Sequence, residues 1–483
     1  MNKRKFLLCT TIIVCIVTIF ALAACSSTGT DNEKDNVKVN INSVEDFLKM
    51  AKQQSQIGTL NEGDKEPKYK GLDSVIYSQS TATNITYTLQ TDIDLSGYPI
   101  TIESGNTDVY PSIIQTLYAT FEGNNKTIKN LSITINEGAS ATNVGLIGEM
   151  MGKIRNLTFD NCVITSNGSI SKAGLAAGNN RGMISNIKTN SNCSITSTSG
   201  SVVGGISGGS SYKTSKILAA TPAAQSITGC TNNATINING GNTIGGIAGS
   251  YTVSRGKLNG GYTRELSNNT NNAAITGSSN VGGIVGSAEA ADLEVKNNVN
   301  NGKITGYNEL GGILGTLSIN INGTRTKGEF SNLVMTNNTN NASIVPTSYV
   351  VNYETNETAY NQLYRCGGIV ASLTVTGDIN TCSITNNNFG SVSKTDVKIE
   401  NACNYIGGIF GSFSISEVKW EAGKQQYTIS NNGVYGNIEL CQDEGVDNTY
   451  VAAGIGSYNP NNYSVSITEG HNATNYPYKV QVA

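Results

Sequence analysis

Apolar and polar residues alternate with a period of two where the repetitive body of the chain begins. The apolar positions are Ile85, Tyr87, Leu89, Ile93 and Leu95. This alternation predicts β-strand. Residues 42–57 follow a different pattern, because their apolar residues gather on one helical face behind Ser43, which can cap a helix. They are Phe47, Leu48, Met50 and Ala51. A short amphipathic helix is therefore predicted before the strands.

A phrase of the form apolar-Gly-apolar-x-Gly recurs through the rest of the chain. Its equivalent glycines are Gly145, Gly174, Gly205, Gly246, Gly283, Gly312, Gly368, Gly408 and Gly454, with looser copies at 174, 368 and 454. The shortest spacing is 29 residues and the longest is 56. A fixed short unit interrupted by insertions is typical of a solenoid. No helical period accompanies it.

A second phrase, Asn-Asn-x-Asn-Asn followed by a short β-prone piece, lies between the copies of the first. It occupies residues 268–272, 297–301 and 337–341. Three strands separated by Gly or Asn turns make one coil, and stacked coils bury a narrow core of Ile, Val and Leu. Equivalent residues then lie about 4.8 Å apart, so asparagine amides form ladders. Gly and Asn suit corners with positive φ. The predicted fold is an all-β, right-handed parallel β-helix with a short N-terminal capping helix.

The extreme N-terminus carries an export signal. Three basic residues at 3–5 precede the uncharged, mostly apolar residues 6–24. The end of this stretch, Leu22-Ala23-Ala24-Cys25, resembles the lipobox of bacterial lipoproteins. The resemblance implies that Cys25 is acylated and begins the mature protein. An uncleaved membrane anchor is the competing interpretation, since 19 such residues nearly span about 30 Å of hydrocarbon. Both interpretations place the body outside the cytoplasm, on the cell membrane or an outer membrane.

Four segments follow from these patterns. Residues 1–24 are expected to be the signal peptide, and residues 25–36 a polar tether. Residues 37–135 would form the capping helix and first coils, and residues 136–483 the Gly/Asn-rich repeats with inserted loops.

The stretch from Phe121 to Ile133 reads Phe-Glu-Gly-Asn-Asn-Lys-Thr-Ile-Lys-Asn-Leu-Ser-Ile. Together with the helix, the tract from Tyr87 to Gly97 and the glycine repeats, it resembles bacterial cell-surface proteins with GLUG repeats. The resemblance is close over residues 40–315 and loose over residues 316–483. It implies a surface β-helix, often in adhesive proteins and sometimes as a stalk on a peptidase or glycan-active enzyme. It implies no family-wide catalytic residues.

Composition narrows the function classes. Charged residues make up 14 per cent of the chain, against roughly 25 per cent in soluble domains. The net charge is −3 and no long basic run lies beyond the N-terminus, so a nucleic-acid partner is not expected. Seven cysteines remain after processing and acylation, and an odd number cannot all pair internally. They are Cys162, Cys193, Cys230, Cys366, Cys382, Cys403 and Cys441. Cys366 replaces Val, Ile or Leu in the repeat, which predicts a buried free thiol.

Two motifs resemble functional sites, but the repeat pattern explains the presence of each of them better. Residues 205–209 fit the G-x-S-x-G nucleophile elbow around Ser207, but no helix follows, as the elbow requires. Residues 92–103 fit a calcium-binding EF-hand loop, but they continue the strand alternation. We interpret the first as coincidence and the second as strand. No catalytic residue, metal site or cofactor is expected.

A polysaccharide-degrading enzyme is the serious alternative among β-helices. Such sites need clustered carboxylates, or Asp-held calcium with an Arg or Lys base. The repeat aspartates do not share a register, and the one histidine, His471, lies near the end. The aspartates are Asp160, Asp292, Asp378 and Asp396.

The longest insertion, around Pro346 to Tyr364, is the predicted ligand-binding loop. Its tyrosines are Tyr349, Tyr353, Tyr360 and Tyr364. Tyrosine is favoured at interfaces, although a loop packed back on its own solenoid would have the same sequence. The sequence thus favours a lipid-anchored surface protein whose β-helix binds a glycan or protein ligand outside the cell. A purely structural envelope or stalk protein is the second class.

Overall fold

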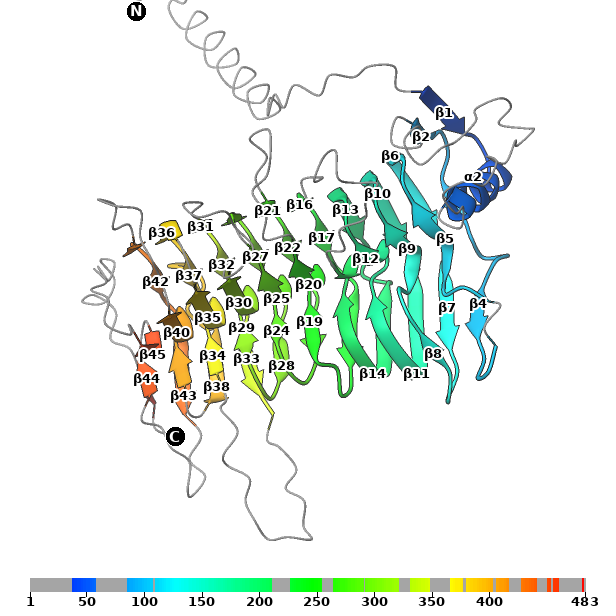
Figure 1. Ribbon diagram of the computed structural model, residues 1–483. Coiled ribbons are helices and arrows are strands. Elements are labelled where there is room, and N and C mark those ends of the chain that lie inside the picture. Colours follow the sequence, from blue (N-terminus) through cyan, green and yellow to red (C-terminus); the bar gives the residue numbers. More distant parts are fainter. Residues whose placement is uncertain are drawn as a thin grey trace, which may run out of the picture. The chain divides into compact units, whose positions relative to one another are not determined.

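The body of the protein is a right-handed parallel β-helix (Figure 1), which confirms the predicted fold class. The structure, a computed structural model, describes residues 37–57, 85–106, 109–210, 226–253, 264–290, 292–320, 331–347, 365–376, 379–402, 405–416, 427–440, 450–452, 455–459 and 480–481. The chain divides into two compact units, residues 1–37 and residues 38–483, and Val37 is the one described residue of the first unit.

Three parallel sheets run the length of the described coils, and each strand pairs with its counterpart one coil away. The strands of the first sheet are β1 (Val37–Ile41), β2 (Ile85–Leu89), β3 (Ile93–Asp94), β6 (Thr120–Lys129), β10 (Lys153–Asp160), β13 (Met183–Thr189), β16 (Ser226–Thr228), β17 (Thr231–Asn232), β21 (Arg264–Ser267), β22 (Thr270–Asn271), β26 (Leu293–Lys296), β27 (Val299–Asn300), β31 (Ser331–Thr336), β32 (Thr339–Asn340), β36 (Ile379–Thr385), β37 (Asn388–Phe389), β41 (Tyr427–Ser430) and β42 (Gly433–Val434).

In most coils the second sheet also receives two short strands separated by a corner. Its strands are β4 (Ile100–Ile102), β7 (Ser132–Ile135), β8 (Ser140–Ala141), β11 (Val163–Ala173), β14 (Ser194–Gly204), β18 (Thr235–Ile238), β19 (Thr243–Gly245), β23 (Ile275–Thr276), β24 (Val281–Gly282), β28 (Ile304–Gly306), β29 (Leu310–Gly311), β33 (Ile344–Pro346), β34 (Arg365–Gly367), β38 (Lys398–Ala402), β39 (Tyr405–Gly407), β43 (Asn437–Leu440), β44 (Tyr450–Ala452) and β46 (Val480–Gln481).

The third sheet takes one strand from each coil. Its strands are β5 (Ser112–Leu117), β9 (Gly145–Met150), β12 (Ala177–Asn180), β15 (Ser207–Gly209), β20 (Ala248–Thr252), β25 (Val285–Glu289), β30 (Leu314–Asn320), β35 (Val370–Thr376), β40 (Phe410–Ser416) and β45 (Ile455–Asn459). From β9 onward each begins at a recurring glycine or within three residues after one, so the glycine phrase marks the entry into this sheet.

Two predicted equivalences are wrong by a residue. Gly407 pairs with Ala452 and Phe410 with Ile455, both at an offset of 45 residues, whereas the repeat alignment proposed 46 between Gly408 and Gly454. The other error lies earlier in the chain. Ala173 pairs with Val203 and Ala177 with Ser207, both at an offset of 30 residues. Gly174 is therefore level with Gly204, and not with Gly205 as the repeat alignment proposed. The copy at Gly174 has one glycine where later copies have two in succession, so its phrase could be aligned either way.

The helix α2 (Val44–Ile57) lies at the N-terminal end of the stack (Figure 1) and covers it as predicted. The Ser43 hydroxyl accepts the backbone N–H of Asp46 at 3.2 Å, which confirms the expected cap. On the covered side, Gln54 Oε1 accepts the N–H of Tyr118 at 3.0 Å, and Ser55 Oγ accepts that of Gln115 at 2.9 Å. The helix thus satisfies donors along β5 that no preceding coil can reach.

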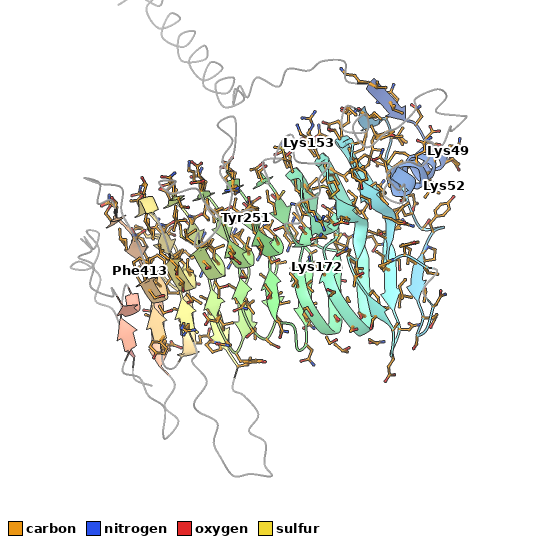
Figure 2. All side chains as sticks on the ribbon, in the orientation of Figure 1. Lys49, Lys52, Lys153, Lys172, Tyr251 and Phe413 are labelled. Atoms are coloured by element: carbon orange, nitrogen blue, oxygen red, sulfur yellow. The ribbon has the colours of Figure 1, made fainter. Side chains whose placement is uncertain are left out.

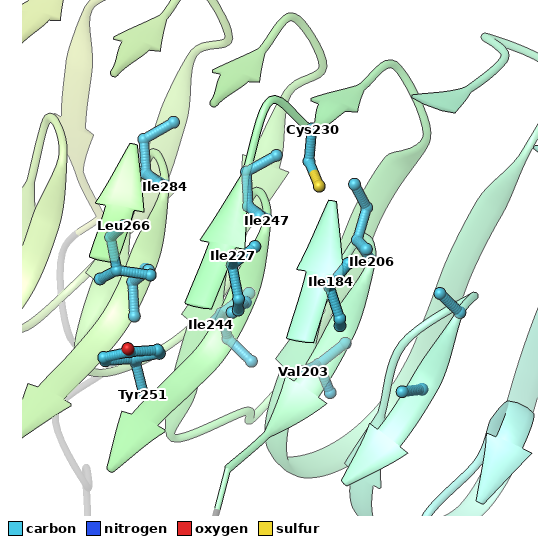
Figure 3. Packing of buried hydrophobic residues seen from close by; sticks show 14 of the residues in the cluster. Ile184, Val203, Ile206, Ile227, Cys230, Ile244, Ile247, Tyr251, Leu266 and Ile284 are labelled. Carbon is cyan, nitrogen blue, oxygen red and sulfur yellow. The ribbon is translucent and has the colours of Figure 1, made fainter. Parts of the chain in front are cut away.

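The core is a set of apolar columns inside the three sheets (Figure 3). Ile184, Ile227 and Leu266 stack in the first sheet, one from each successive coil. Ile247 and Ile284 stack where the chain enters the third sheet, and both are fully buried. Each coil alone would leave these side chains half in water, so stacking supplies the burial that stabilises the fold.

Asparagine ladders run beside this core, as the repeat predicts. Asn298 Nδ2 donates to Asn338 Oδ1 at 2.9 Å, and Asn300 Nδ2 donates to Asn340 Oδ1 at 2.9 Å. All four side chains are buried. The first asparagine of each phrase has positive φ, for example 54° at Asn297, which an L-residue adopts readily only if it is Asn or Asp. The phrase therefore supplies both the corner and the ladder.

Candidate functional site

The predicted lipidation site and the predicted ligand-binding tyrosines of the longest insertion lie outside the described residues. These are Cys25, Tyr349, Tyr353, Tyr360 and Tyr364. The described chain leaves β33 at Pro346 and re-enters the second sheet at Arg365. The one helix of the described residues, α2, is too short and too polar to cross a membrane.

The motif that fits a nucleophile elbow and the motif that fits an EF-hand loop both have structural roles in the described part of the chain. Ser207 is fully buried and faces the core between Ala177 and Ala248, so its hydroxyl cannot meet a substrate. In the loop resembling an EF-hand, Asp92 pairs with Lys129 at 2.9 Å. Asp94 Oδ1 accepts the side-chain amide of Asn130 at 2.8 Å.

Clusters of metal-binding residues are not found in the described part of the chain, where no group of three or more His, Cys, Asp or Glu could hold a metal ion. Asp160 accepts the amide of Asn190 at 2.8 Å, and Asp292 lies 4.0 Å from buried Arg264. Cys366 is buried and forms no disulfide with another described cysteine, in agreement with the prediction.

The outer face of the third sheet offers a different cluster. Along this sheet, residues at one outward position form a row from coil to coil. In the later coils the row consists of Ser250, Ser287, Thr316, Ser372 and Ser412. In the earlier coils the same row holds Thr116, Glu149, Asn179 and Gly209. The row of small hydroxyls is therefore interrupted by a carboxylate and an amide on two neighbouring coils.

Hydrogen bonds connect these two coils. Lys172 Nζ donates to Asn179 Oδ1 at 3.0 Å, and Asn179 Nδ2 donates to Glu149 Oε1 at 3.1 Å. Arg181 Nη2 lies 2.5 Å from the same Glu149 oxygen. We call these four residues and the adjacent Tyr118 the Glu149 cluster. Lys172 lies on the strand that leads into the corner before β12 (Figure 2).

A glycine makes room for the lysine. The next residue in the row after Asn179 is Gly209, and a Cβ atom there would come within 3.3 Å of Lys172 Cδ and 2.9 Å of Ser250 Oγ. The absent side chain lets the lysine stem lie along the sheet with its ammonium group on Asn179. Long apolar stems with polar heads commonly cover a surface in this way.

The cluster is half-buried and carries one more positive than negative charge. The side chain of Arg181 is 15% exposed and that of Glu149 is 28% exposed. Arg181 Nε is buried and has no hydrogen-bond partner among the described residues. Burial, and then the negative charge of Glu149, raise the pKa of the Tyr118 hydroxyl, which Arg181 partly offsets. Tyr118 is therefore a neutral hydrogen-bonding group at neutral pH.

This arrangement suits recognition better than catalysis. It presents a guanidinium, an ammonium and a phenol, all of which can bind oxygen atoms, while the buried amide of Asn179 links Lys172 to Glu149. It contains one carboxylate, already bound to Arg181, whereas glycoside hydrolysis commonly uses two. Sequence reasoning missed these residues because each is ordinary in its own coil. The one signal was Glu149 in a repeat position that later copies fill with Ser or Thr.

Comparisons of this chain with protein families, with curated proteins and with solved structures find no match.

Proposed function

We propose that this protein is an exported, lipid-anchored binding protein whose β-helix presents the Glu149 cluster to a glycan. One observation carries the proposal: chemically diverse polar side chains converge, half-buried, on a sheet face that is otherwise lined with small hydroxyls. A flat sheet with fixed coil spacing holds such groups in position before a ligand arrives. Preorganisation of this kind reduces the entropy lost on binding.

The charge of the cluster favours an acidic glycan. Lys172 and Arg181 together outweigh the single carboxylate of Glu149. A guanidinium binds carboxylates in a planar, two-bonded geometry that lysine cannot reproduce. The buried Nε of Arg181 lacks an acceptor, which costs about 1–3 kcal/mol. A sugar carboxylate that draws Arg181 outward would supply that acceptor.

The test compares binding of acidic and neutral oligosaccharides to the full chain. Arg181→Gln should weaken binding of the acidic series about tenfold or more, because it removes a charged hydrogen bond. Arg155→Gln is the matched control, since Arg155 is also paired with a glutamate, Glu122 at 2.6 Å, but lies on the first sheet. Equal binding by both variants and wild type would refute this site. Release of shortened oligosaccharides during the assay would instead favour a polysaccharide-degrading enzyme.

The anchor is tested separately through Cys25. Only a cysteine thiol at the lipobox can accept the lipid, so Cys25→Ala should abolish incorporation of a palmitate analogue. Cys230→Ala, which removes a buried thiol of the core, should keep the label. Equal labelling of Cys25→Ala and wild type would contradict lipidation at this residue.

A structural spacer is the second candidate function. The unbroken core and buried asparagine ladders favour it, because both stiffen the stack from coil to coil. A spacer requires no ligand, so it predicts that neither acidic nor neutral glycans bind.

A further inference from the structure

Two cysteines occupy the same place in successive coils. Strands β11 and β14 pair in register, so Cys162 and Cys193, the residues immediately before them, lie one above the other. Both are buried, with 0% and 1% of their surface exposed. The residues of this column one coil below and above are Leu131 and Ala234. The column therefore holds two adjacent thiols between apolar neighbours.

The thiol of Cys193 lies against the backbone of Cys162. The backbone N–H of Cys162 donates to Cys193 Sγ at 3.3 Å. The thiol of Cys193 also contacts the carbonyl oxygen of Phe159 at 3.4 Å, and the thiol of Cys162 contacts that of Asp160 at 3.3 Å. In-register parallel strands are about 4.8 Å apart, and disulfides join residues whose Cα atoms are about 4.4–6.8 Å apart. The backbone spacing thus already fits a disulfide.

We infer that Cys162 and Cys193 form a disulfide that joins two successive coils. The oxidant is the disulfide of a small thiol or of a thiol oxidoreductase. The Cys193 thiolate attacks one sulfur of that disulfide and expels the other as a thiolate. The Cys162 thiolate then attacks the Cys193 sulfur and expels the second thiolate. Two protein thiols are oxidised, one external disulfide is reduced, and the two protons pass to the two leaving thiolates.

The local environment prepares Cys193 for the first step. A hydrogen bond from the Cys162 thiol, reinforced by backbone N–H groups, lowers the pKa of the Cys193 thiol. The thiolate is the attacking species in disulfide exchange. The exposed turn residues Asn161 and Asn192 immediately precede the two cysteines, so a small opening of these turns admits the oxidant.

The other described cysteines lack such a neighbour. Within their columns, Cys230 lies level with Asn269, and Cys366 lies between Leu310 and Ile406. Burial raises the pKa of Cys230 to about 12, which suppresses its thiolate. Cys230 is therefore a suitable control position.

The experiment equilibrates the full chain with oxidised and reduced glutathione, quenches it, alkylates it after unfolding and maps the peptides by mass. We expect a peptide pair linked through Cys162 and Cys193. The oxidised protein should melt about 5 °C above the reduced protein, because the cross-link closes a loop of one coil. Cys230→Ala should keep this redox-dependent difference, and Cys162→Ala should lose it.

Alkylation of both thiols in the oxidised sample would overturn the inference, and so would a link from either one to Cys403 or Cys441. If Cys162→Ala does not fold, the peptide map of the wild type decides alone. The test uses purified protein and a defined oxidant, so its outcome is independent of glycan binding and of the lipid anchor.

Discussion

The buried asparagine ladder should be the most sensitive polar element of the fold, and Asn298→Ala tests it. Asn298 Nδ2 donates to Asn338 Oδ1 and to the carbonyl oxygen of Leu266, at 2.9 and 2.8 Å. Its Oδ1 accepts the side-chain and backbone N–H groups of Asn269, at 3.0 and 3.1 Å. The side chain is fully buried. Truncation therefore removes four hydrogen bonds at once.

The magnitude follows from the groups left without partners. The Leu266 carbonyl, the Asn269 backbone N–H and one Asn269 amide hydrogen lose their partners inside the stack. Each orphaned buried group costs about 1–3 kcal/mol. We therefore expect the free energy of unfolding to fall by at least about 3 kcal/mol. Urea unfolding followed by circular dichroism measures this change.

Asn301→Ala is the matched control. Asn301 belongs to the same phrase and donates to Asn272 Oδ1 at 2.9 Å, but this ladder is exposed to water. Its loss should change the unfolding free energy by less than about 0.5 kcal/mol. Equal effects of the two substitutions would refute the reasoning, because burial would then contribute nothing to the strength of the ladder.

Three further predictions concern the core, the second sheet and the insertion. Ile313→Asp places a charge in the column between Ile284 and Ile369 and should lower the free energy of unfolding by about 4 kcal/mol or more. A melting temperature within about 2 °C of wild type would contradict the register. Burial raises the pKa of Glu309 above its ordinary value of 4.5, so its stabilising contribution is full below about pH 4.5 and is lost as pH rises through the folded pKa. Thermal melts should therefore show the wild type losing stability relative to Glu309→Gln as pH rises from 4.5 towards 7. Replacing residues 348–364 with a Gly-Ser link should leave the strand signal in circular dichroism unchanged. The double variant Tyr353→Ala/Tyr360→Ala should reduce attachment to cells or matrix. A lower melting temperature with normal attachment would instead show that these rings are packing residues.

The fold was predictable because each coil repeats the same local chemistry. Glycine and asparagine mark the corners, isoleucine marks the core, and the shortest spacing defines the coil. The register failed at Gly174, where one glycine is missing and the phrase can slide by a residue. The Glu149 cluster was not predictable, since Asn179 and Arg181 meet Glu149, with Lys172 on Asn179, only after coils with different spacings have been aligned. A one-residue error in that alignment would separate them.

Stacking also explains why the chain has so few charges. Side chains in one column lie about 4.8 Å apart, where two like charges repel by about 1 kcal/mol even in water. An amide or hydroxyl both donates and accepts, so Asn, Ser and Thr can stack on copies of themselves, as Ser412 does on Ser372 at 3.1 Å. A charged residue instead needs an opposite charge one coil away.

The described ion pairs largely follow this rule. Lys129 pairs with Asp92, Arg155 with Glu122, and Lys398 with Glu439, each across neighbouring coils. The exception is a stack of two glutamates, Glu265 on Glu294, and there Lys296 pairs with Glu294 at 2.6 Å on the same strand. A composition of 14 per cent charged residues is thus a consequence of the repeat. It also makes the Glu149 cluster unusual, because Arg181 pairs with Glu149 while Lys172 binds the neutral amide of Asn179, which leaves one positive charge for a ligand to neutralise.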